Sequence, residues 1–596
     1  MGRVPEGGRN FEGFGADPYL AGEAAFETVA GLQKHGVQAC AKHYLNNEQE
    51  HDRTTTTSQV SDRVQHELYL HPFLRSVQAG VSSVMCSYNL INGTYACQND
   101  VTLNGWLKGE FGFEGYVMSD WGANHATHSA TNGLDMTMPG AIQADGTDEF
   151  FGSSLVEAVR NGTVQRERLE DMATRIVAAW FAMGQDSDYP DVNFNAFSPN
   201  GTINKHVDVQ EDHYQLIRKI GAASTVLLKN LGSLPLRHPR SLVLIGSDAG
   251  PSLNGPNYYQ DRAGIDGIVA QGWGSGTADY PYLISPLEAI QARAREEHTS
   301  LSWYLHDFNL QQAAQASLNK DVAIVFIAAI SGEEYLNVDG NVGDRKNLTA
   351  WNGGDALVEA VAAQNPNTIV VVHSVGPILM PWANHENITA IVWAGISGQE
   401  AGNSLTDVLY GDWNPSGRLP YTIAKTESDY KTRILPNSQE VVYSEGWVSP
   451  LPMYPRSDLS YPDSISTIVI LTQTALSPCS NLVSASRIHG LSTLACTHPS
   501  QTTLLPRPKT GCQGLQRPVP ETTEVHWRIG AYKRPRFCHL FNFGVFPGFI
   551  GNFGRSNSRS RIQGRSSARR YLSSTLGSPT RHKNHHVCYE DSRMWC

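Results

Sequence analysis

The segment from Gly115 to Trp121 places an acid and an indole at the end of a short apolar run. The residues before Asp120 predict a buried strand. In parallel α/β barrels the catalytic residues gather at the C-terminal ends of the strands. An ionised Asp120 beside the flat face of Trp121 is suited to attack the anomeric carbon of a sugar ring. A solvated aspartate that closes an ordinary strand is the alternative interpretation.

Polar side chains also end the neighbouring predicted strands. Lys42 and His43 supply a cation and a ring donor. Met85 and Tyr88 follow on the next strand, where a phenol can hydrogen-bond a carboxylate and hold it ionised. Arg9 follows a glycine pair, and its fork of donors can grip vicinal hydroxyls. A surface ammonium, a core histidine and a core aromatic are the structural alternatives for Lys42, His43 and Tyr88.

Strands and helices alternate in the first part of the chain, as in a parallel sheet wrapped by helices. Ser61 is the expected N-cap of one helix and Gly80 its end. The pattern predicts helices over residues 17–36, 61–80 and 103–111, and strands over 37–41, 81–88 and 115–120, followed by a further unit at 133–139. An eight-stranded barrel takes about 250 residues. Only four or five units precede residue 180, so we expect the beginning of the barrel to be absent.

A second α/β region follows a loop-rich linker at 183–205. Near-continuous Val/Ile runs predict strands that are covered on both faces. These strands lie at 242–245, 322–328, 368–372 and 388–393. The sequence thus predicts an α/β fold with a partial barrel over 1–182, an α/β sandwich over 206–446 and a largely disordered tail over 447–596.

Charge separates the tail from the rest of the 596-residue chain, whose net charge is −11. Up to residue 450 there are 28 Lys and Arg against 51 Asp and Glu, and from 451 onward there are 18 against 6. The tail is rich in Ser, Pro and Arg and has no apolar period, which is typical of disorder. Binding of nucleic acid by its Arg-rich segments is a remote alternative. The sequence contains no run of about 18 apolar residues, so no membrane-spanning helix is predicted.

Three features of the sequence bear on the cellular compartment. The first six residues lack the apolar core of a signal peptide. Cys86 and Cys97 flank a turn and can close a small loop in an oxidising compartment, or remain two free thiols. Five Asn-x-Ser/Thr acceptors weakly favour secretion and glycosylation. They are Asn92, Asn161, Asn200, Asn347 and Asn387.

Four blocks in this order resemble the signature blocks of family 3 glycoside hydrolases, with the closest similarity to the fungal β-glucosidases. The blocks cover residues 8–14, 41–44, 85–89 and 117–121. The resemblance extends from residue 8 to about 446. It implies a barrel followed by an α/β sandwich, usually with a fibronectin-like third domain, and an active site between the first two domains.

The resemblance also implies roles for individual residues. Asp120 matches the nucleophile. The segment 331–335 resembles the second-domain loop that holds the general acid/base, which places this role on Glu333, with Glu334 as the alternative. Ser275 lies in a loop that reaches the same pocket; its glycine spacing also resembles a phosphate-binding motif, but no clear strand precedes it and no capped helix follows. The positions that line the glucose subsite are Arg9, Lys42, His43, Met85, Tyr88 and Trp121.

The implied activity is that of a β-glucosidase acting on terminal non-reducing β-D-glucosyl residues of cello-oligosaccharides and glucosides in cellulose degradation. A retaining enzyme needs carboxyl groups roughly 5–5.5 Å apart. Asp120 must be ionised, and the surroundings of Glu333 must raise its pKa so that it carries a proton. Neither a metal nor a cofactor is required. We expect a secreted protein that binds neither nucleic acid nor membrane. A β-xylosidase and an inactive sugar-binding fragment are the alternatives.

Two departures from the family pattern follow. The family barrel starts upstream of Arg9 and includes an aspartate that grips the non-reducing sugar, and no residue matches it. Half a barrel exposes a sheet edge and an unfilled core. After residue 446 the family pattern gives way to the basic tail. The hypothesis is that the tail is translated intron or out-of-frame sequence and that the start is misplaced.

Overall fold

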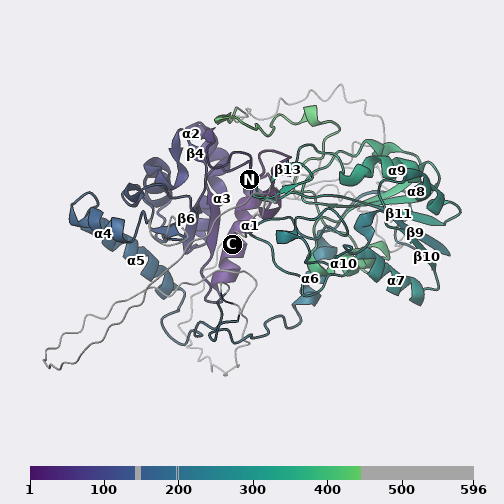
Figure 1. Ribbon diagram of the computed structural model, residues 1–596, viewed down its shortest axis with the longest axis horizontal. Coiled ribbons are helices and arrows are strands. Elements are labelled where there is room, and N and C mark those ends of the chain that lie inside the picture. The colour runs from purple at the N-terminus through teal and green to yellow at the C-terminus, as the bar shows by residue number, and fades with distance from the viewer. Residues whose placement is uncertain (141–148, 196–197, 199, 445–596) are drawn as a thin grey trace, which may run out of the picture. The chain divides into compact units, whose positions relative to one another are not determined.

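The computed structural model describes residues 1–140, 149–195, 198 and 200–444 (Figure 1). The predicted basic tail, residues 447–596, lies outside the described residues. Residues 1–189 and 208–444 belong to one compact unit, and the segment 190–207 belongs to a second unit. Among the described residues, no helix has the length and apolar character needed to cross a bilayer.

The first half of the compact unit contains a four-stranded parallel sheet in the order β1-β3-β6-β7. The connections between its strands carry helices (Figure 1). The strands are β1 (Cys40–Tyr44), β3 (Ser83–Cys86), β6 (Tyr116–Trp121) and β7 (Met136–Met138). The helices are α1 (Pro18–Gln33), α2 (Asp62–Val64), η2 (Gln65–Tyr69), α3 (His71–Gln78), η4 (Val101–Glu110), α4 (Ser153–Arg160) and α5 (Arg166–Ala182). In the described residues, β1 and β7 are edge strands, and the partial barrel is confirmed.

Register within this sheet places the predicted site residues side by side. Lys42 pairs with Met85, and Met85 pairs with Met118. The prediction of a strand at 37–41 was wrong in position, because β1 runs over Cys40–Tyr44 and contains Lys42 and His43 within it. The polar site residues belong to the strand itself, so the apolar run alone underestimates where the strand ends.

The helix predicted at 61–80 is divided in three. Ser61 caps α2 through its hydroxyl, as expected. A π-helical turn, η2, follows, and its end is marked by a 2.8 Å hydrogen bond from the N–H of Leu70 to the carbonyl of Gln65. Pro72 lies in the first turn of α3, where its missing N–H costs no helical hydrogen bond. The predicted helix at 103–111 is also π-helical, as η4.

The second half contains a six-stranded sheet in the order β10-β9-β11-β14-β15-β8, parallel except for β8. Its strands are β8 (Val226–Asn230), β9 (Ser241–Ile245), β10 (Ser300–Tyr304), β11 (Val322–Ala329), β14 (Thr368–Ser374) and β15 (Ile388–Trp393). The helices are α6 (His213–Ser224), α7 (Pro286–Glu296), α8 (Leu310–Ser317), α9 (Gly354–Ala362) and α10 (Ala401–Leu409). All four predicted strands are confirmed.

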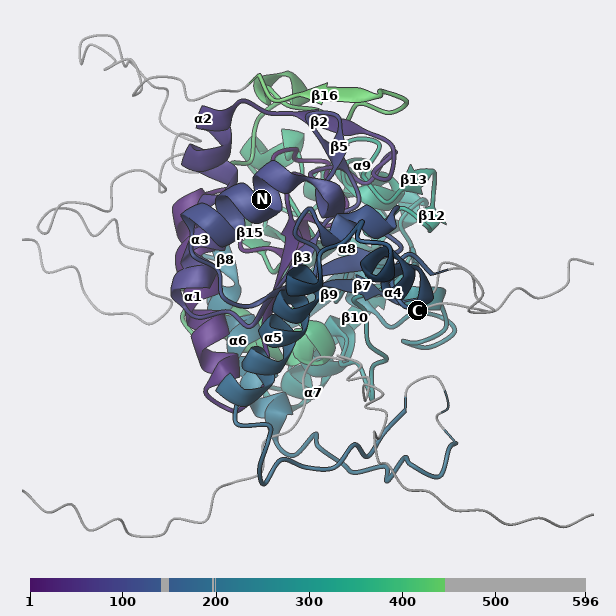
Figure 2. The same ribbon diagram turned by 90° about the vertical axis from the view of Figure 1, so that its left-hand side faces the viewer.

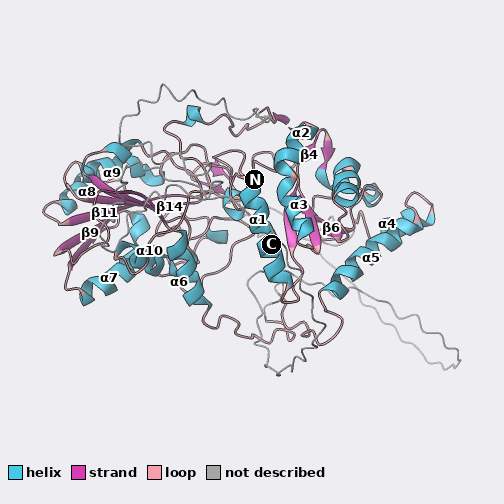
Figure 3. Cartoon of the chain, turned by 180° about the vertical axis from the view of Figure 1, so that it is seen from behind, coloured by secondary structure: helices cyan, strands magenta, loops and turns pink. Residues whose placement is uncertain are grey.

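Alternate residues of these strands enter two separate cores. Val243 and Ile245 pack with Leu357 of α9 on one face. Leu242 packs with Ile290 of α7 on the other. Figure 3 shows α8 and α9 on one side of this sheet and α7 and α10 on the opposite side. The near-continuous apolar runs therefore reflect burial on both faces, as predicted.

The last described strand returns to the first half of the chain. β16 (Glu440–Val442) pairs in parallel with β2 (Thr57–Gln59) (Figure 2). On its other side β2 pairs in parallel with β4 (Leu90–Ile91), which pairs antiparallel with β5 (Thr94–Tyr95). Tyr443 packs in the same core as the four-stranded sheet. The remaining short strands, β12 (Asn337–Val338) and β13 (Asn341–Val342), form a hairpin in the loop after β11.

Candidate active site

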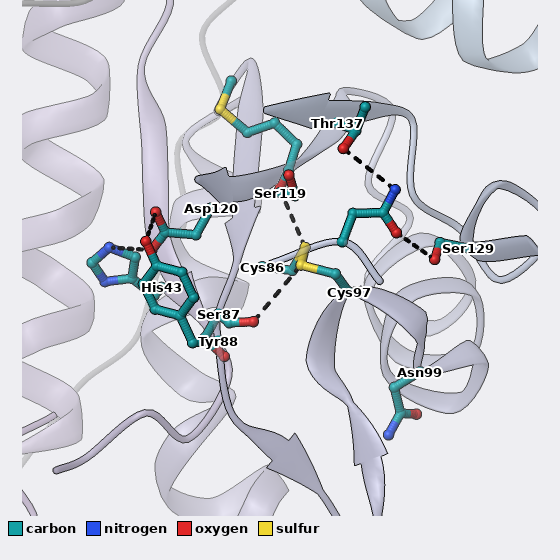
Figure 4. The surroundings of a disulfide bond; sticks show 12 residues. His43, Cys86, Ser87, Tyr88, Cys97, Asn99, Ser119, Asp120, Ser129 and Thr137 are labelled. Carbon is teal, nitrogen blue, oxygen red and sulfur yellow. Dashed lines mark hydrogen bonds and ion pairs between the residues drawn. A yellow bond between two sulfur atoms is a disulfide. The ribbon is translucent and has the colours of Figure 1, made fainter. Parts of the chain in front are cut away.

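Asp120 lies at the end of β6 and is 7% exposed. Its Oδ1 accepts hydrogen bonds from the hydroxyl of Tyr88 at 2.9 Å and from the N–H of Trp121 at 2.7 Å. The other oxygen, Oδ2, lies 3.3 Å from Nε2 of His43 (Figure 4). No described residue donates a hydrogen bond to Oδ2. One oxygen therefore has two donors, while the other is buried beside His43 without one.

Burial and nearby cations set the pKa values of Asp120 and His43. The pKa of Asp120 is raised overall, because burial outweighs Arg9, the N–H of Trp121 and the Tyr88 hydroxyl, which lower it. Burial, together with the nearby cations Arg9 and Lys42, holds the pKa of His43 well below its usual range. His43 is therefore a neutral neighbour of Asp120 and not its counter-ion.

Glu333 lies in the loop after β11 and is 4% exposed. Ser275 donates to its Oε2 twice, from the backbone N–H at 2.9 Å and from Oγ at 2.6 Å. The loop is fixed by Trp273, whose indole donates to the carbonyl of Glu333 at 3.1 Å. A Cβ on Gly332 would lie 2.1 Å from the carbonyl oxygen of Trp273, so this approach requires glycine.

Two arginines from the first half bind the same carboxylate. Nη1 of Arg53 donates to Oε1 of Glu333 at 2.8 Å, and Nη1 of Arg9 lies 3.4 Å from that oxygen. The Arg53 guanidinium also lies over the ring of Tyr88, 4.3 Å from its centre. A continuous set of contacts therefore joins Asp120 to Glu333 through Tyr88 and Arg53.

The pKa of Glu333 does not follow the sequence-based expectation. Burial raises it, but Arg9, Arg53 and the hydrogen bonds from Ser275 outweigh burial and lower the pKa to about 2. The expectation of a raised pKa was therefore wrong for this arrangement. The reason is that Arg9, the predicted sugar ligand, lies against Glu333.

Glu334 differs from Glu333 in its surroundings. Its side chain is 25% exposed, against 6% for Glu333, and its Oε1 lies 3.6 Å from Nε of Arg53. Its N–H donates to Oε2 of Glu50 at 3.2 Å. Glu333 is thus the glutamate held by the arginines and Ser275, whereas burial raises the pKa of Glu334.

Arg9 and Lys42 both contact a carboxylate that the sequence did not single out. Glu12 accepts hydrogen bonds from Nε and Nη2 of Arg9 at 2.6 and 2.9 Å, and from Nζ of Lys42 at 3.3 Å. Burial raises the pKa of Glu12, but Arg9 and Lys42 outweigh it and lower the pKa overall. Both predicted sugar ligands therefore share Glu12 as a partner.

The remaining predicted residues occupy the same strand ends. Met85 is buried on β3, and Trp121 is 45% exposed at the end of β6. The structure therefore brings Asp120, His43, Tyr88, Arg9, Ser275 and Glu333 into one network of contacts. It also adds Glu12, Glu50, Arg53 and Asp344, which the sequence analysis missed.

Asp344 is fully buried in the loop after β13 and binds three backbone groups of the first half. Its Oδ1 accepts from the N–H of Gly8 at 2.7 Å, and its Oδ2 accepts from the N–H groups of Glu50 and His51, each at 2.9 Å. Nδ1 of His51 lies 3.0 Å from Oδ2. The acidic pair in Glu48–Gln49–Glu50 and the downstream Arg53 were the only sequence signals for this cluster.

A disulfide joins Cys86 to Cys97 beside the site (Figure 4). It closes the loop that carries Tyr88. Among the predicted glycosylation sites, Asn161 and Asn200 are exposed and Asn347 is half-buried. The amide groups of Asn92 and Asn387 donate to the carbonyls of Val60 and Ala362. A glycan at either of these two positions would have to replace that hydrogen bond.

The fold and the site define an α/β protein with a parallel sheet in each half, in which buried carboxylates from both halves enter a shared network. The model for the glycosyl hydrolase family 3 N-terminal domain matches residues 1–179, and the model for the C-terminal domain of that family matches residues 225–449. The chain belongs to glycosyl hydrolase family 3.

The chain is similar to named fungal proteins over most of its described residues. It is 52% identical over 451 residues to "Probable beta-glucosidase L" of Aspergillus terreus, covering 75% of this chain and 61% of that protein. It matches the solved structure of a Chaetomium thermophilum beta-glucosidase with a TM-score of 0.73 and 48% identity, covering 75% and 57% of the two chains. It matches the solved structure of the Trichoderma reesei beta-D-glucoside glucohydrolase with a TM-score of 0.70 and 47% identity, covering 75% of this chain and 62% of that chain. The chain spans less than two thirds of each of these relatives.

Proposed function

We propose that this protein is a β-glucosidase that removes terminal non-reducing β-D-glucosyl residues from cello-oligosaccharides and β-glucosides. The observation that carries the proposal is the network joining Asp120 of β6 to Glu333 of the loop after β11. Two buried carboxylates with different surroundings are what a glycosidase requires. The names of the similar fungal proteins support glucose as the sugar.

In the proposed first step, Oδ2 of Asp120 attacks the anomeric carbon and forms a covalent glycosyl-enzyme with inversion. The Tyr88 hydroxyl and the N–H of Trp121 hold Oδ1, so the attacking oxygen is the one without a donor. Glu333 protonates the leaving oxygen. In the second step, Glu333 removes a proton from the water that releases glucose.

Glu333 must hold a proton at the start of this sequence. In the structure Arg9 and Arg53 favour its ionised form, and burial acts against them. The proposed acid role therefore requires that bound substrate weaken the contacts of Glu333 with these arginines, which would raise its pKa.

The remaining assignments complete the proposal. The sugar contacts are assigned to Arg9, Lys42, His43, Met85, Tyr88, Trp121 and Ser275. The mechanism needs no metal or cofactor, and the substrate is the only partner proposed. We also propose domain boundaries at 182 and 206. Secretion and glycosylation are part of the same proposal, and the disulfide supports secretion because such bonds persist in oxidising compartments.

Labelling with an activated 2-deoxy-2-fluoro-β-glucoside tests the proposal. Such a reagent forms the glycosyl-enzyme faster than water releases it, so the peptide containing Asp120 should gain one fluoroglucosyl group by mass spectrometry. The Asp120→Asn variant should remain unlabelled, while Asp100→Asn, an exposed control, should label normally. Labelling of another residue, or equal labelling of Asp120→Asn, would contradict the assignment. A matching fluoroxyloside that labels faster would favour a β-xylosidase.

A further inference from the structure

Asp344 has a fully buried side chain in the loop after β13 and has no role in the mechanism above. Its Oδ1 accepts the backbone N–H of Gly8 at 2.7 Å, and its Oδ2 accepts the N–H groups of Glu50 and His51 at 2.9 Å each. All three donors belong to the first half of the chain, 336, 294 and 293 residues away. One carboxylate of the second half therefore holds two separate main-chain segments of the first half through charge-assisted hydrogen bonds.

Each of these segments leads directly to an arginine that contacts Glu333. Gly8 precedes Arg9, whose Nη1 lies 3.4 Å from Oε1 of Glu333. Glu50 begins a turn in which the N–H of Arg53 donates to the Glu50 carbonyl at 3.2 Å. Nη1 of Arg53 donates to the same Oε1 at 2.8 Å. The buried carboxylate therefore fixes the main chain beside both arginines.

The loop that carries Glu333 packs backbone against backbone at the same junction. The hydroxyl of Ser331 donates to the carbonyl of Gly8 at 2.7 Å, and the N–H of Gly332 donates to the carbonyl of Gly343 at 3.2 Å. A Cβ on Gly8 would lie 2.3 Å from the carbonyl oxygen of Gly332, so this approach requires glycine. The positions of Glu333 and of both arginines are therefore set where these main-chain segments meet.

We propose that Asp344 is a positioning residue that places Arg9 and Arg53 against Glu333. The proposal rests on the proposed function, in which Arg9 binds the sugar and Glu333 is the acid/base. The Asp344 side chain is fully buried, so it acts through the main chain and not by contact with the sugar. Fixing the main chain leaves both arginine side chains able to shift when substrate binds. A misplacement of about 1 Å in a site can cost about 100-fold in rate.

Loss of a buried charge destabilises a fold wherever it occurs, so the test needs a matched control. Asp248 is 3% exposed and has the same kinds of partner. Its Oδ1 accepts the N–H of Val269 at 3.0 Å, and its Oδ2 lies 2.6 Å from Nδ1 of His373. Both partners belong to the second half of the chain. Asp248→Asn therefore removes a buried carboxylate without touching the segments that carry the arginines.

Asp344→Asn should release one of the two segments. The amide oxygen can accept from Glu50 and His51 together or from Gly8 alone, and the first arrangement satisfies more donors. The NH2 group then faces the N–H of Gly8. In hydrogen–deuterium exchange resolved to single residues, Gly8 should lose its protection in the variant, while Glu50 and His51 keep theirs. In the wild type all three should exchange slowly, and this measurement decides the proposal even if the variant does not fold.

Kinetics of the full chain test the positioning role. We expect Asp344→Asn to lower kcat/KM for a dinitrophenyl β-glucoside by about 100-fold, with rates divided by the folded fraction from circular dichroism. In an Arg9→Met background the same change should cost less than about 3-fold, because substitutions that act through one group are not additive. Asp248→Asn should lower the Tm and leave kcat/KM of the folded protein unchanged.

Three results would overturn the inference: equal fold losses in the two backgrounds, a wild-type kcat/KM in Asp344→Asn, or rapid exchange of Gly8 in the wild type. A purely structural role predicts the first two. If the wild type hydrolyses no glucoside, the proposed function fails by itself. Exchange at Gly8 still decides whether the Asp344 carboxylate holds this segment, since unchanged protection in Asp344→Asn would show that it does not.

Discussion

The hydroxyl of Tyr88 donates a 2.9 Å hydrogen bond to Oδ1 of Asp120, which directs the unpartnered Oδ2 toward His43. The bond joins the ends of β3 and β6, two adjacent strands in register. The proposed nucleophile is therefore oriented by its own sheet, before any contact with the second half of the chain.

Tyr88→Phe should lower kcat/KM for an aryl β-glucoside by about 10- to 100-fold, since a hydrogen bond to a charged group contributes about 1.5–3 kcal/mol. The hydroxyl favours the ionised form, so its loss raises the pKa of Asp120 and moves the acidic limb of the kcat/KM profile to higher pH. Tyr116→Phe on β6, which loses a hydrogen bond to Gln38, is the control. An unshifted limb in Tyr88→Phe would contradict the role.

Ser275→Ala should move the basic limb of the activity profile to higher pH. The Ser275 hydroxyl, 2.6 Å from Oε2 of Glu333, stabilises the ionised carboxylate. Its removal raises the pKa of Glu333, so the proton is retained to higher pH. The pH dependence of kcat measures this shift. Ser302→Ala, in β10, should leave the limb in place; a shift to lower pH in Ser275→Ala would be inconsistent with the geometry.

Asp344→Asn should destabilise the protein by about 3–5 kcal/mol, the cost of removing one partner of a buried charged cluster. The pKa of His51 is raised by its hydrogen bond to Asp344. That bond stabilises the fold most below pH 6.5 and loses its effect as pH rises through the raised value. The variant should therefore have a lower Tm and a weaker pH dependence of Tm near neutrality. Asp339→Asn, at an exposed ion pair with Lys346, should alter neither.

Replacing Cys86 and Cys97 together by Ala should lower stability by about 3 kcal/mol, the contribution of a disulfide that closes a loop of this size. The separation of the two cysteines is 11 residues. Thermal unfolding with and without a reductant measures the effect, and the double variant should be insensitive to the reductant. Cys40→Ala removes the unpaired thiol of the described residues and controls for loss of sulfur. A Tm equal to that of the wild type would show that the bridge does not stabilise the fold.

The sequence predicted those strands and helices whose apolar and polar residues alternate in a pattern visible within a few residues. The apolar run before Asp120 and the Val/Ile runs of the second sheet predicted their strands, because burial of one or both faces imposes those patterns. It did not predict the π-helical turns at 65–69 and 101–110, because their apolar spacing is close to that of an α-helix.

From the residue pattern alone, the candidate site was predictable at the ends of strands; Arg9, Ser275 and Glu333 lie outside the strands, and the resemblance to the family blocks assigned their roles. Asp120, His43 and Tyr88 lie at such strand ends. Glu50, Arg53 and Asp344 were missed, because their significance comes from partners hundreds of residues away, such as the 280 residues between Arg53 and Glu333. The lowered pKa of Glu333 also depends on those partners.

The pairing of β16 with β2 has a consequence for biosynthesis. Thr56 binds the carbonyl of Ser438 across 382 residues of sequence. A nascent chain emerging from the ribosome has translated β2 long before its neighbour exists, and at ordinary elongation rates the wait is on the order of tens of seconds. Until β16 is translated, the backbone hydrogen-bonding groups along one edge of β2 have no strand partner. A chaperone that binds exposed strand edges would act on the chain at this stage of translation.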